Sequence, residues 1–106
     1  MILVITDDLS GAAELAGIAF AHGLTAEVQT EFQPRTEAQV ICLDTDTRRL
    51  KPNDAVAVLQ KLARRIKAAS PEFIFKKTDS ALRGSIGAEL GVLLEITARV
   101  RAVFVP

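Results

Sequence analysis

The residues Ile2-Leu3-Val4-Ile5-Thr6-Asp7-Asp8-Leu9-Ser10-Gly11-Ala12 decide the fold. Their first part, Ile2 to Thr6, is a continuous apolar run, which is typical of a strand buried on both faces of a parallel sheet. The run ends on two carboxylates and passes into an Ala- and Leu-rich segment. That segment predicts a helix over Ser10–His22, with Gly23 just past its end. A strand followed at once by a helix is the first half of a βαβ unit.

The rest of the chain repeats this alternation. Further strands are predicted at Thr25–Thr30, Gln39–Leu43, Glu72–Phe75 and Ala102–Val105, and further helices at Pro52–Ala69 and Leu82–Ala98. Alternating apolar strands and amphipathic helices imply right-handed parallel crossovers. We therefore predict an α/β fold with three layers and a mostly parallel sheet of Rossmann or flavodoxin type. Because the chain stops directly after its fifth predicted strand, we expect it to be the opening part of a larger protein; the alternative is a small complete domain.

Composition restricts the class of function. Of the 106 residues, 49% are hydrophobic and 25% are charged, and the formal net charge is zero. The absence of a basic excess argues against binding to nucleic acid or to an anionic membrane surface. No apolar run is long enough to span a bilayer and the N-terminus lacks the features of a signal peptide, so we expect a cytoplasmic protein. One cysteine, Cys42, and one histidine, His22, offer no material for a zinc site, and no metal site is expected.

Three polar clusters follow three of the predicted strands. They cover residues 6–12, 44–49 and 77–84. Ligands of open α/β sheets bind beyond the carboxyl ends of the strands, and a parallel sheet brings those ends to one edge. The sequence therefore predicts one shared site for a small, polar, negatively charged ligand.

The first two clusters suit a ligand with hydroxyl and carboxylate groups. Asp7 and Asp8 are adjacent carboxylates that fit a general base, a metal ligand or an acceptor for a polyol, although one of them could simply cap the following helix. Asp44, Asp46 and Arg48 alternate along an extended segment and should share a face. The alternative is an exposed Asp–Arg pair of little consequence.

The third cluster combines cations, a carboxylate and a hydroxyl beside a predicted helix start. Lys77 and Asp79 share an alternation face, whereas Lys76 is expected to be solvated. Arg83 is predicted to lie in the first helical turn, where a cation is unfavourable unless an anion offsets it. The missing side chain of Gly84 allows a ligand to approach closely. The candidate residues of this cluster are Lys77, Asp79, Ser80, Arg83 and Gly84.

Together these motifs resemble the N-terminal domain of the four-carbon acid sugar kinase family. The matching stretches are Asp7-Asp8-Leu9-Ser10-Gly11-Ala12, Asp44-Thr45-Asp46-Thr47-Arg48 and Lys76-Lys77-Thr78-Asp79-Ser80-Ala81-Leu82-Arg83-Gly84-Ser85-Ile86-Gly87-Ala88-Glu89-Leu90. The family usually has Thr where this chain has Ser10, and Ser where it has Thr47. Both departures exchange one hydroxyl side chain for another. The resemblance covers essentially the whole chain.

The resemblance implies that residues 1–106 are the N-terminal part of a sugar-acid-binding domain, and that a C-terminal ATP-binding domain is absent from the chain. The full-length parent would phosphorylate erythronate, threonate or a 3-oxo-tetronate with ATP and Mg²⁺, neither of which this chain alone would bind. The chain alone would therefore be inactive. The residues that the resemblance places at the sugar-acid site are Asp7, Asp8, Asp46, Arg48, Lys77, Asp79, Ser80 and Arg83.

Chemistry suggests a role for each of these groups. Arg48, Lys77 or Arg83 would hold the substrate carboxylate. Asp46 and Asp79 would accept hydrogen bonds from hydroxyl groups. Asp7 or Asp8 would orient or deprotonate the attacking hydroxyl, and we prefer Asp8 as the catalytic residue.

Two other functions are compatible with parts of the sequence. A phosphoacceptor receiver domain has an acidic pair after its first strand and an Asp after its third, but its lysine after the last strand is replaced here by Pro106. A phosphatase of the haloacid dehalogenase type would use Asp44 and Asp46, but this chain lacks the Thr or Val expected at position 48. The chain has no Walker A or Gly-x-Gly-x-x-Gly pattern, so no nucleotide site of its own is predicted. An exposed final strand also suggests a homodimer.

Overall fold

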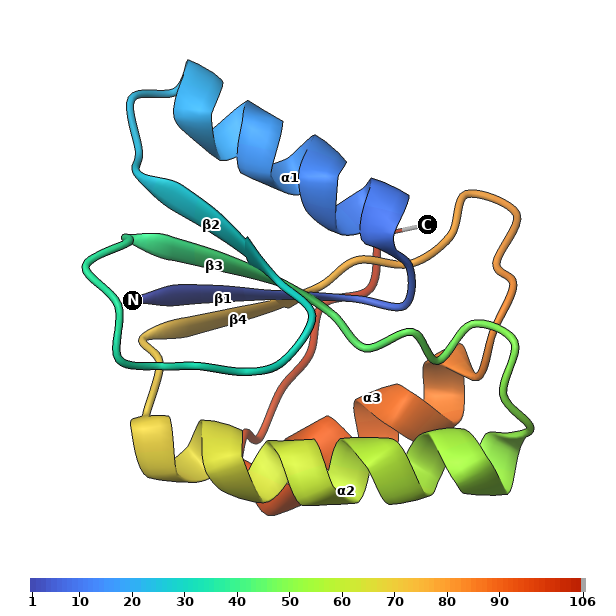
Figure 1. Ribbon diagram of the computed structural model, residues 1–106. Helices are drawn as coiled ribbons and strands as arrows, with labels where there is room; N and C mark the ends of the chain where they lie inside the picture. Colours follow the sequence, from blue (N-terminus) through green and yellow to red (C-terminus); the bar gives the residue numbers. More distant parts are fainter. Residues whose placement is uncertain (106) are drawn as a thin grey trace.

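The computed structural model describes residues 1–105, which form a four-stranded parallel sheet between two layers of helices (Figure 1). The elements in chain order are β1 (Ile2–Thr6), α1 (Leu9–Ala21), β2 (Ala26–Gln29), β3 (Val40–Asp44), α2 (Pro52–Ala69), β4 (Phe73–Lys76) and α3 (Ile86–Ile96). The strand order is β2-β3-β1-β4. The predicted α/β class, three-layer arrangement and parallel sheet are confirmed.

Alternating side chains of the central strands pack into two separate cores. On one face of the sheet, Leu3 and Ile5 of β1 pack with Leu59 and Ile66 of α2, and α3 adds Leu93. On the other face, Val4, Val40 and Cys42 pack against Ala12 of α1. Both faces of β1 and β3 are therefore covered, which explains why these strands are apolar throughout.

Strand register places the polar clusters together. Thr6 of β1 lies opposite Asp44 of β3, and Ile5 lies opposite Lys76 of β4. The three strands thus end at nearly the same level. The segments that follow them leave the sheet at its carboxyl edge, on the right-hand side of Figure 1.

The predicted fifth strand is wrong. Residues 101–105 have no regular secondary structure and are exposed, and β4 pairs only with β1 among the described strands. The apolar run Val103-Phe104-Val105 suggested a strand, but such a composition reports suitability for a pleated, half-buried surface and not an intrinsic preference for pairing. Phe73 and Phe75 of β4 are exposed.

The predicted start of the third helix is also wrong. α3 begins at Ile86 with Ser85 as its N-cap, and not at Leu82. Leu82 and Gly84 have positive φ angles of 57° and 90°. Because residues in that conformation cannot belong to a right-handed helix, residues 77–85 form a loop. We call this segment the 77–85 loop.

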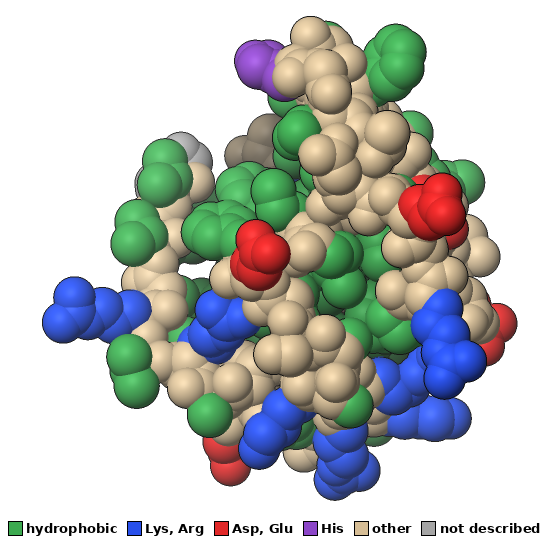
Figure 2. All heavy atoms as spheres, turned by 90° about the vertical axis from the view of Figure 1, so that its left-hand side faces the viewer, with side chains coloured by type: hydrophobic (Ala, Val, Ile, Leu, Met, Phe, Trp, Pro, Cys, Tyr) green, Lys and Arg blue, Asp and Glu red, His purple; other side chains and the backbone are tan. Residues whose placement is uncertain are grey.

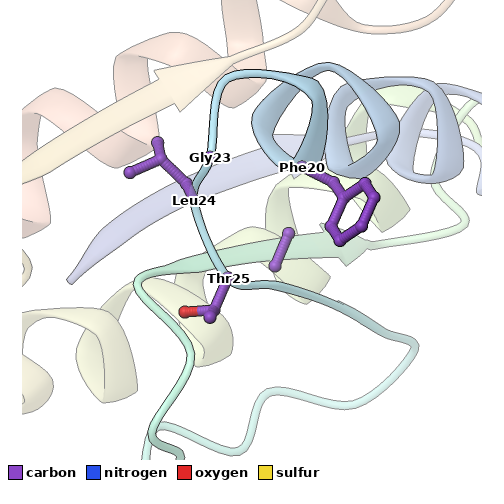
Figure 3. A pocket seen from close by; sticks show the side chains of 5 residues that line it. Phe20, Gly23, Leu24 and Thr25 are labelled. Atoms are coloured by element: carbon purple, nitrogen blue, oxygen red, sulfur yellow. The ribbon is translucent and has the colours of Figure 1, made fainter.

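The opposite edge of the sheet has a different character. Figure 2 shows apolar side chains between the two helical layers and Lys and Arg side chains gathered along the α2 side. A shallow hollow at the end of α1 is lined by Phe20, Gly23, Leu24, Thr25 and Ala26 (Figure 3). Within residues 1–105, no helix has the length and apolar character needed to cross a membrane.

Candidate functional site

Arg48 joins the three polar clusters. Its guanidinium lies between three carboxylates: Nη2 is 3.0 Å from Oδ1 of Asp7, Nη1 is 3.2 Å from Oδ2 of Asp8, and Nη2 is 3.4 Å from Oδ1 of Asp79. The Arg48 backbone N–H also donates to the Asp7 carbonyl. Since these residues follow β3, β1 and β4, the three clusters meet at one edge of the sheet. The hydrogen bond to Asp7 and the nearby carboxylates raise the pKa of Arg48.

Asp79 and Arg83 form a bidentate pair within the 77–85 loop. Arg83 donates from Nε to Oδ2 at 2.7 Å and from Nη2 to Oδ1 at 2.9 Å. Asp79 Oδ2 also accepts from the backbone N–H groups of Ala81 and Arg83, which folds the loop around this carboxylate. The hydrogen bond from Arg83 holds the pKa of Asp79 well below its usual range. The prediction that Arg83 lies in the first helical turn is wrong, because α3 begins at Ile86. Arg83 therefore does not oppose the dipole of α3.

Asp8 has two contacts at once. It is the N-cap of α1, where Oδ1 accepts from the Gly11 N–H at 3.0 Å, while its Oδ2 faces Arg48. A Cβ at position 11 would lie 2.7 Å from Asp8 Oδ1 and 3.3 Å from Cδ of Lys77. Gly11 thus makes room for the chain's own side chains. Lys77 extends over it, with Nζ 3.6 Å from the Glu14 carboxylate.

The predicted common face of Asp44, Asp46 and Arg48 is not formed. Asp46 has a φ angle of 52° and is exposed, and its N–H donates to Oδ1 of Asp44 at 2.7 Å. The left-handed residue interrupts the extended alternation, so Arg48 turns toward Asp7. Asp44 is buried, and the loss of solvent raises its pKa.

Ser80 and Gly84 lie on the exposed side of the loop. A Cβ at Gly84 would lie 2.9 Å from Oδ2 of Asp7 and close to the Arg48 backbone, so the loop passes directly over this carboxylate. In the described part of the chain, no three His, Cys, Asp or Glu side chains are grouped to hold a metal ion. A guanidinium occupies the centre of the carboxylate cluster instead.

One buried ion pair beside the site was not predicted from the sequence. Lys76, expected to be solvated, has only 8% of its side chain exposed and lies 2.9 Å from Oε2 of Glu89, which is 2% exposed. The signal was present in the periodicity. Glu89 comes three residues after Ile86 and four before Leu93, on the apolar face of α3. A charged residue on such a face indicates a buried partner.

The chain is similar in sequence to a known family and to curated kinases. The family described as "Sugar-binding N-terminal domain" matches residues 2–106. The chain is 40% identical over 96 residues to a D-threonate kinase of Cupriavidus necator, covering 86% of this chain and 23% of the relative. It is 27% identical over 100 residues to a D-erythronate kinase of Heliobacterium modesticaldum, covering 90% of this chain and 23% of the relative.

A solved structure shares the fold. It is a crystal structure of a domain of unknown function (DUF1537) from Bordetella bronchiseptica, described as a domain-swapped dimer with bound citrate. The TM-score is 0.81 at 27% identity, over 90% of this chain and 25% of that chain. The present chain therefore spans about a quarter of the length of the relatives it matches.

Proposed function

This chain belongs to the family of sugar-binding N-terminal domains, and we propose that it is the sugar-acid-recognising part of a longer kinase. That kinase would transfer a phosphoryl group from ATP to a four-carbon sugar acid such as threonate or erythronate. The names of the curated relatives support this assignment. The single observation that carries it is the meeting of Asp7, Asp8, Arg48, Asp79 and Arg83 at the carboxyl edge of the sheet.

The exposed cation of this cluster is Arg83. Its side chain is 64% exposed. Nε and Nη2 donate to Asp79, whereas Nη1 has no hydrogen-bond partner within residues 1–105. Arg48, in contrast, directs Nε, Nη1 and Nη2 at carboxylates. We therefore assign the substrate carboxylate to Arg83, with Lys77 as the second cation. Arg48 is assigned to holding the carboxylates in place.

Carboxylate oxygens would bind the hydroxyl groups of the substrate. An ionised carboxylate has about four lone-pair sites, so Asp8 keeps acceptor capacity beyond its bonds to Gly11 and Arg48. We assign Asp8 to orienting the attacking hydroxyl and accepting its proton, with Asp7 and the exposed Asp46 as further acceptors. Phosphoryl transfer depends mainly on such positioning and on electrostatics.

Within residues 1–105, no three His, Cys, Asp or Glu side chains are grouped to hold a metal ion. The carboxylates that could hold a cation surround Arg48, and the sequence has no phosphate-binding glycine loop. We assign ATP and Mg²⁺ to parts of the kinase outside this chain. The alternative phosphatase and receiver functions are not favoured, because they leave the long match over residues 76–90 unexplained. A homodimer is consistent with the dimeric relative and can be measured by light scattering.

Titration of the isotope-labelled chain with threonate, erythronate and the neutral polyol threitol tests the proposal by NMR. We expect saturable shifts at the 77–85 loop with the acids, and none with threitol. Arg83→Ala should abolish the shifts, whereas Arg64→Ala, at an exposed arginine of α2, should preserve them. Equal responses to acid and polyol, or unchanged binding by Arg83→Ala, would refute the assignment of Arg83.

A further inference from the structure

The Lys76–Glu89 pair is unusual because it is almost fully buried. Its two side chains are 8% and 2% exposed, and the charged atoms lie 2.9 Å apart. Glu89 Oε1 is the one buried side-chain polar atom that lacks a hydrogen-bond partner in the described residues. A buried ion pair adds little to stability, and apolar residues of similar volume often replace one without loss. The stability of the core therefore does not explain this pair.

Its position suggests what the pair does. Lys76 is the last residue of β4, and Glu89 lies in the first turn of α3. Lys76 Nζ also donates to the Lys77 carbonyl at 3.4 Å. Glu89 is in turn bonded through its N–H to the Ser85 carbonyl at 2.9 Å. The pair thus connects the first and last residues of the 77–85 loop.

The loop itself has few other buried attachments. Residues 80–84 are exposed, and Asp79 is the buried side chain between the two ends. The loop also includes two residues with positive φ angles, Leu82 and Gly84. This conformation is unfavourable for Leu82, which is not a glycine. A segment with so few buried contacts is expected to open locally unless its ends are fixed.

We propose that Lys76 and Glu89 are positioning residues for the 77–85 loop. Their ion pair fixes the spacing between the end of β4 and the start of α3, and this spacing sets the places of Asp79 and Arg83. The ordering of the loop follows from the contacts of the free chain. Its consequence for sugar-acid affinity rests on the function proposed above.

Amide hydrogen exchange of the ligand-free chain tests the ordering of the loop. The reporters are the N–H groups of Ala81 and Arg83, which donate to the Asp79 carboxylate. The internal reference is the N–H of Thr45, which donates to the Thr6 carbonyl at 2.9 Å, outside the loop. In the double variant Lys76→Met/Glu89→Leu, we expect the reporters to exchange about tenfold faster while Thr45 is unchanged.

Conservative variants separate positioning from a purely structural role. Lys76→Arg retains the ion pair, so the reporter amides should exchange as slowly as in the wild-type chain. If the double variant does not fold, Glu89→Gln decides, because it keeps the volume and removes the charge; faster reporter exchange is again expected. Wild-type exchange at Ala81 and Arg83 in a folded variant that lacks the ion pair would overturn the proposal. So would an equal increase at Thr45, since that would indicate general destabilisation.

Threonate titration of the same variants provides the second readout. We expect weaker binding when the ion pair is removed and wild-type binding in Lys76→Arg. If the wild-type chain binds no sugar acid, the proposed function fails while the exchange result for the loop still stands. If binding is unchanged in a variant with fast exchange, the loop is not the part that holds the ligand, and the functional consequence of the proposal is refuted.

Discussion

Replacing Arg48 with methionine should strongly destabilise the fold, because three carboxylates lose the cation between them. The nitrogen-to-oxygen distances are 3.0, 3.2 and 3.4 Å, and Asp7 and Asp79 are 6% and 7% exposed. Even with the dielectric constant of water, each contact is worth about 1.3 kcal/mol, or about 4 kcal/mol for the three. This agrees with the roughly 3–5 kcal/mol lost when one partner of a buried pair is removed.

Urea denaturation at neutral pH, followed by circular dichroism, measures the loss. A change of about 4 kcal/mol corresponds to a fall in melting temperature of roughly 15–30 °C for a domain of this size. The exposed Arg64 provides the matched control, and Arg64→Met should stay within about 0.5 kcal/mol of wild type. Asp7→Asn added to Arg48→Met should recover part of the stability, because one uncompensated charge is removed. A loss below about 1 kcal/mol for Arg48→Met would refute the reasoning, since only well-solvated carboxylates would tolerate the change.

Two further substitutions probe the surroundings of this cluster. Gly84→Ala should cost about 1–3 kcal/mol in urea denaturation, because φ is +90° and the new Cβ would meet Asp7 at 2.9 Å. Gly87→Ala in α3 is the control, because nothing lies within 4 Å of its Cβ position, and it should stabilise the fold by about 0.5–1 kcal/mol. Equal changes in stability for the two variants would contradict the strain and close contact assigned to position 84. Burial raises the pKa of Asp44 in the folded state. Ionised Asp44 therefore lowers the stability of the fold above this pKa, and the loss of stability disappears as the pH falls through it. Asp44→Asn, whose amide oxygen still accepts from Asp46, should raise the unfolding midpoint at neutral pH more than at acidic pH; the reverse pH trend would count against it.

The sheet and its polar edge could be predicted because periodicity reports them directly. The apolar run at Ile2–Thr6 is typical of a strand buried on both faces, and the carboxyl ends of parallel strands meet at one edge. The contacts within the site were harder to predict. The direction of the Arg48 side chain depends on the left-handed backbone of Asp46, which interrupts the extended alternation. No sequence pattern predicted that conformation.

The errors at the end of the chain have a common cause. Val103-Phe104-Val105 has the composition of a strand, and Leu82 to Ser85 continues the apolar spacing of α3. Both predictions relied on local pattern alone. The helix starts later than predicted because the Asp79 carboxylate accepts hydrogen bonds from the Ala81 and Arg83 amides and holds this segment in a loop. The fifth strand is not formed because a strand requires a neighbouring strand as well as a suitable composition.

The contacts of Arg48 also bear on how the chain folds. Its partners Asp7 and Asp79 lie far from it in the sequence, before and after it, and are brought close only when β3, β1 and β4 are all in place. Long-range contacts of this kind require loop closure before any favourable interaction is gained, so they form late in folding. We therefore expect the site to be absent from partly folded chains. A ligand that binds there selects fully assembled molecules, and at a hundredfold excess over its dissociation constant it would add about 2.7 kcal/mol to their stability. Thermal shift with candidate sugar acids would thus report the affinity of the fully assembled molecules.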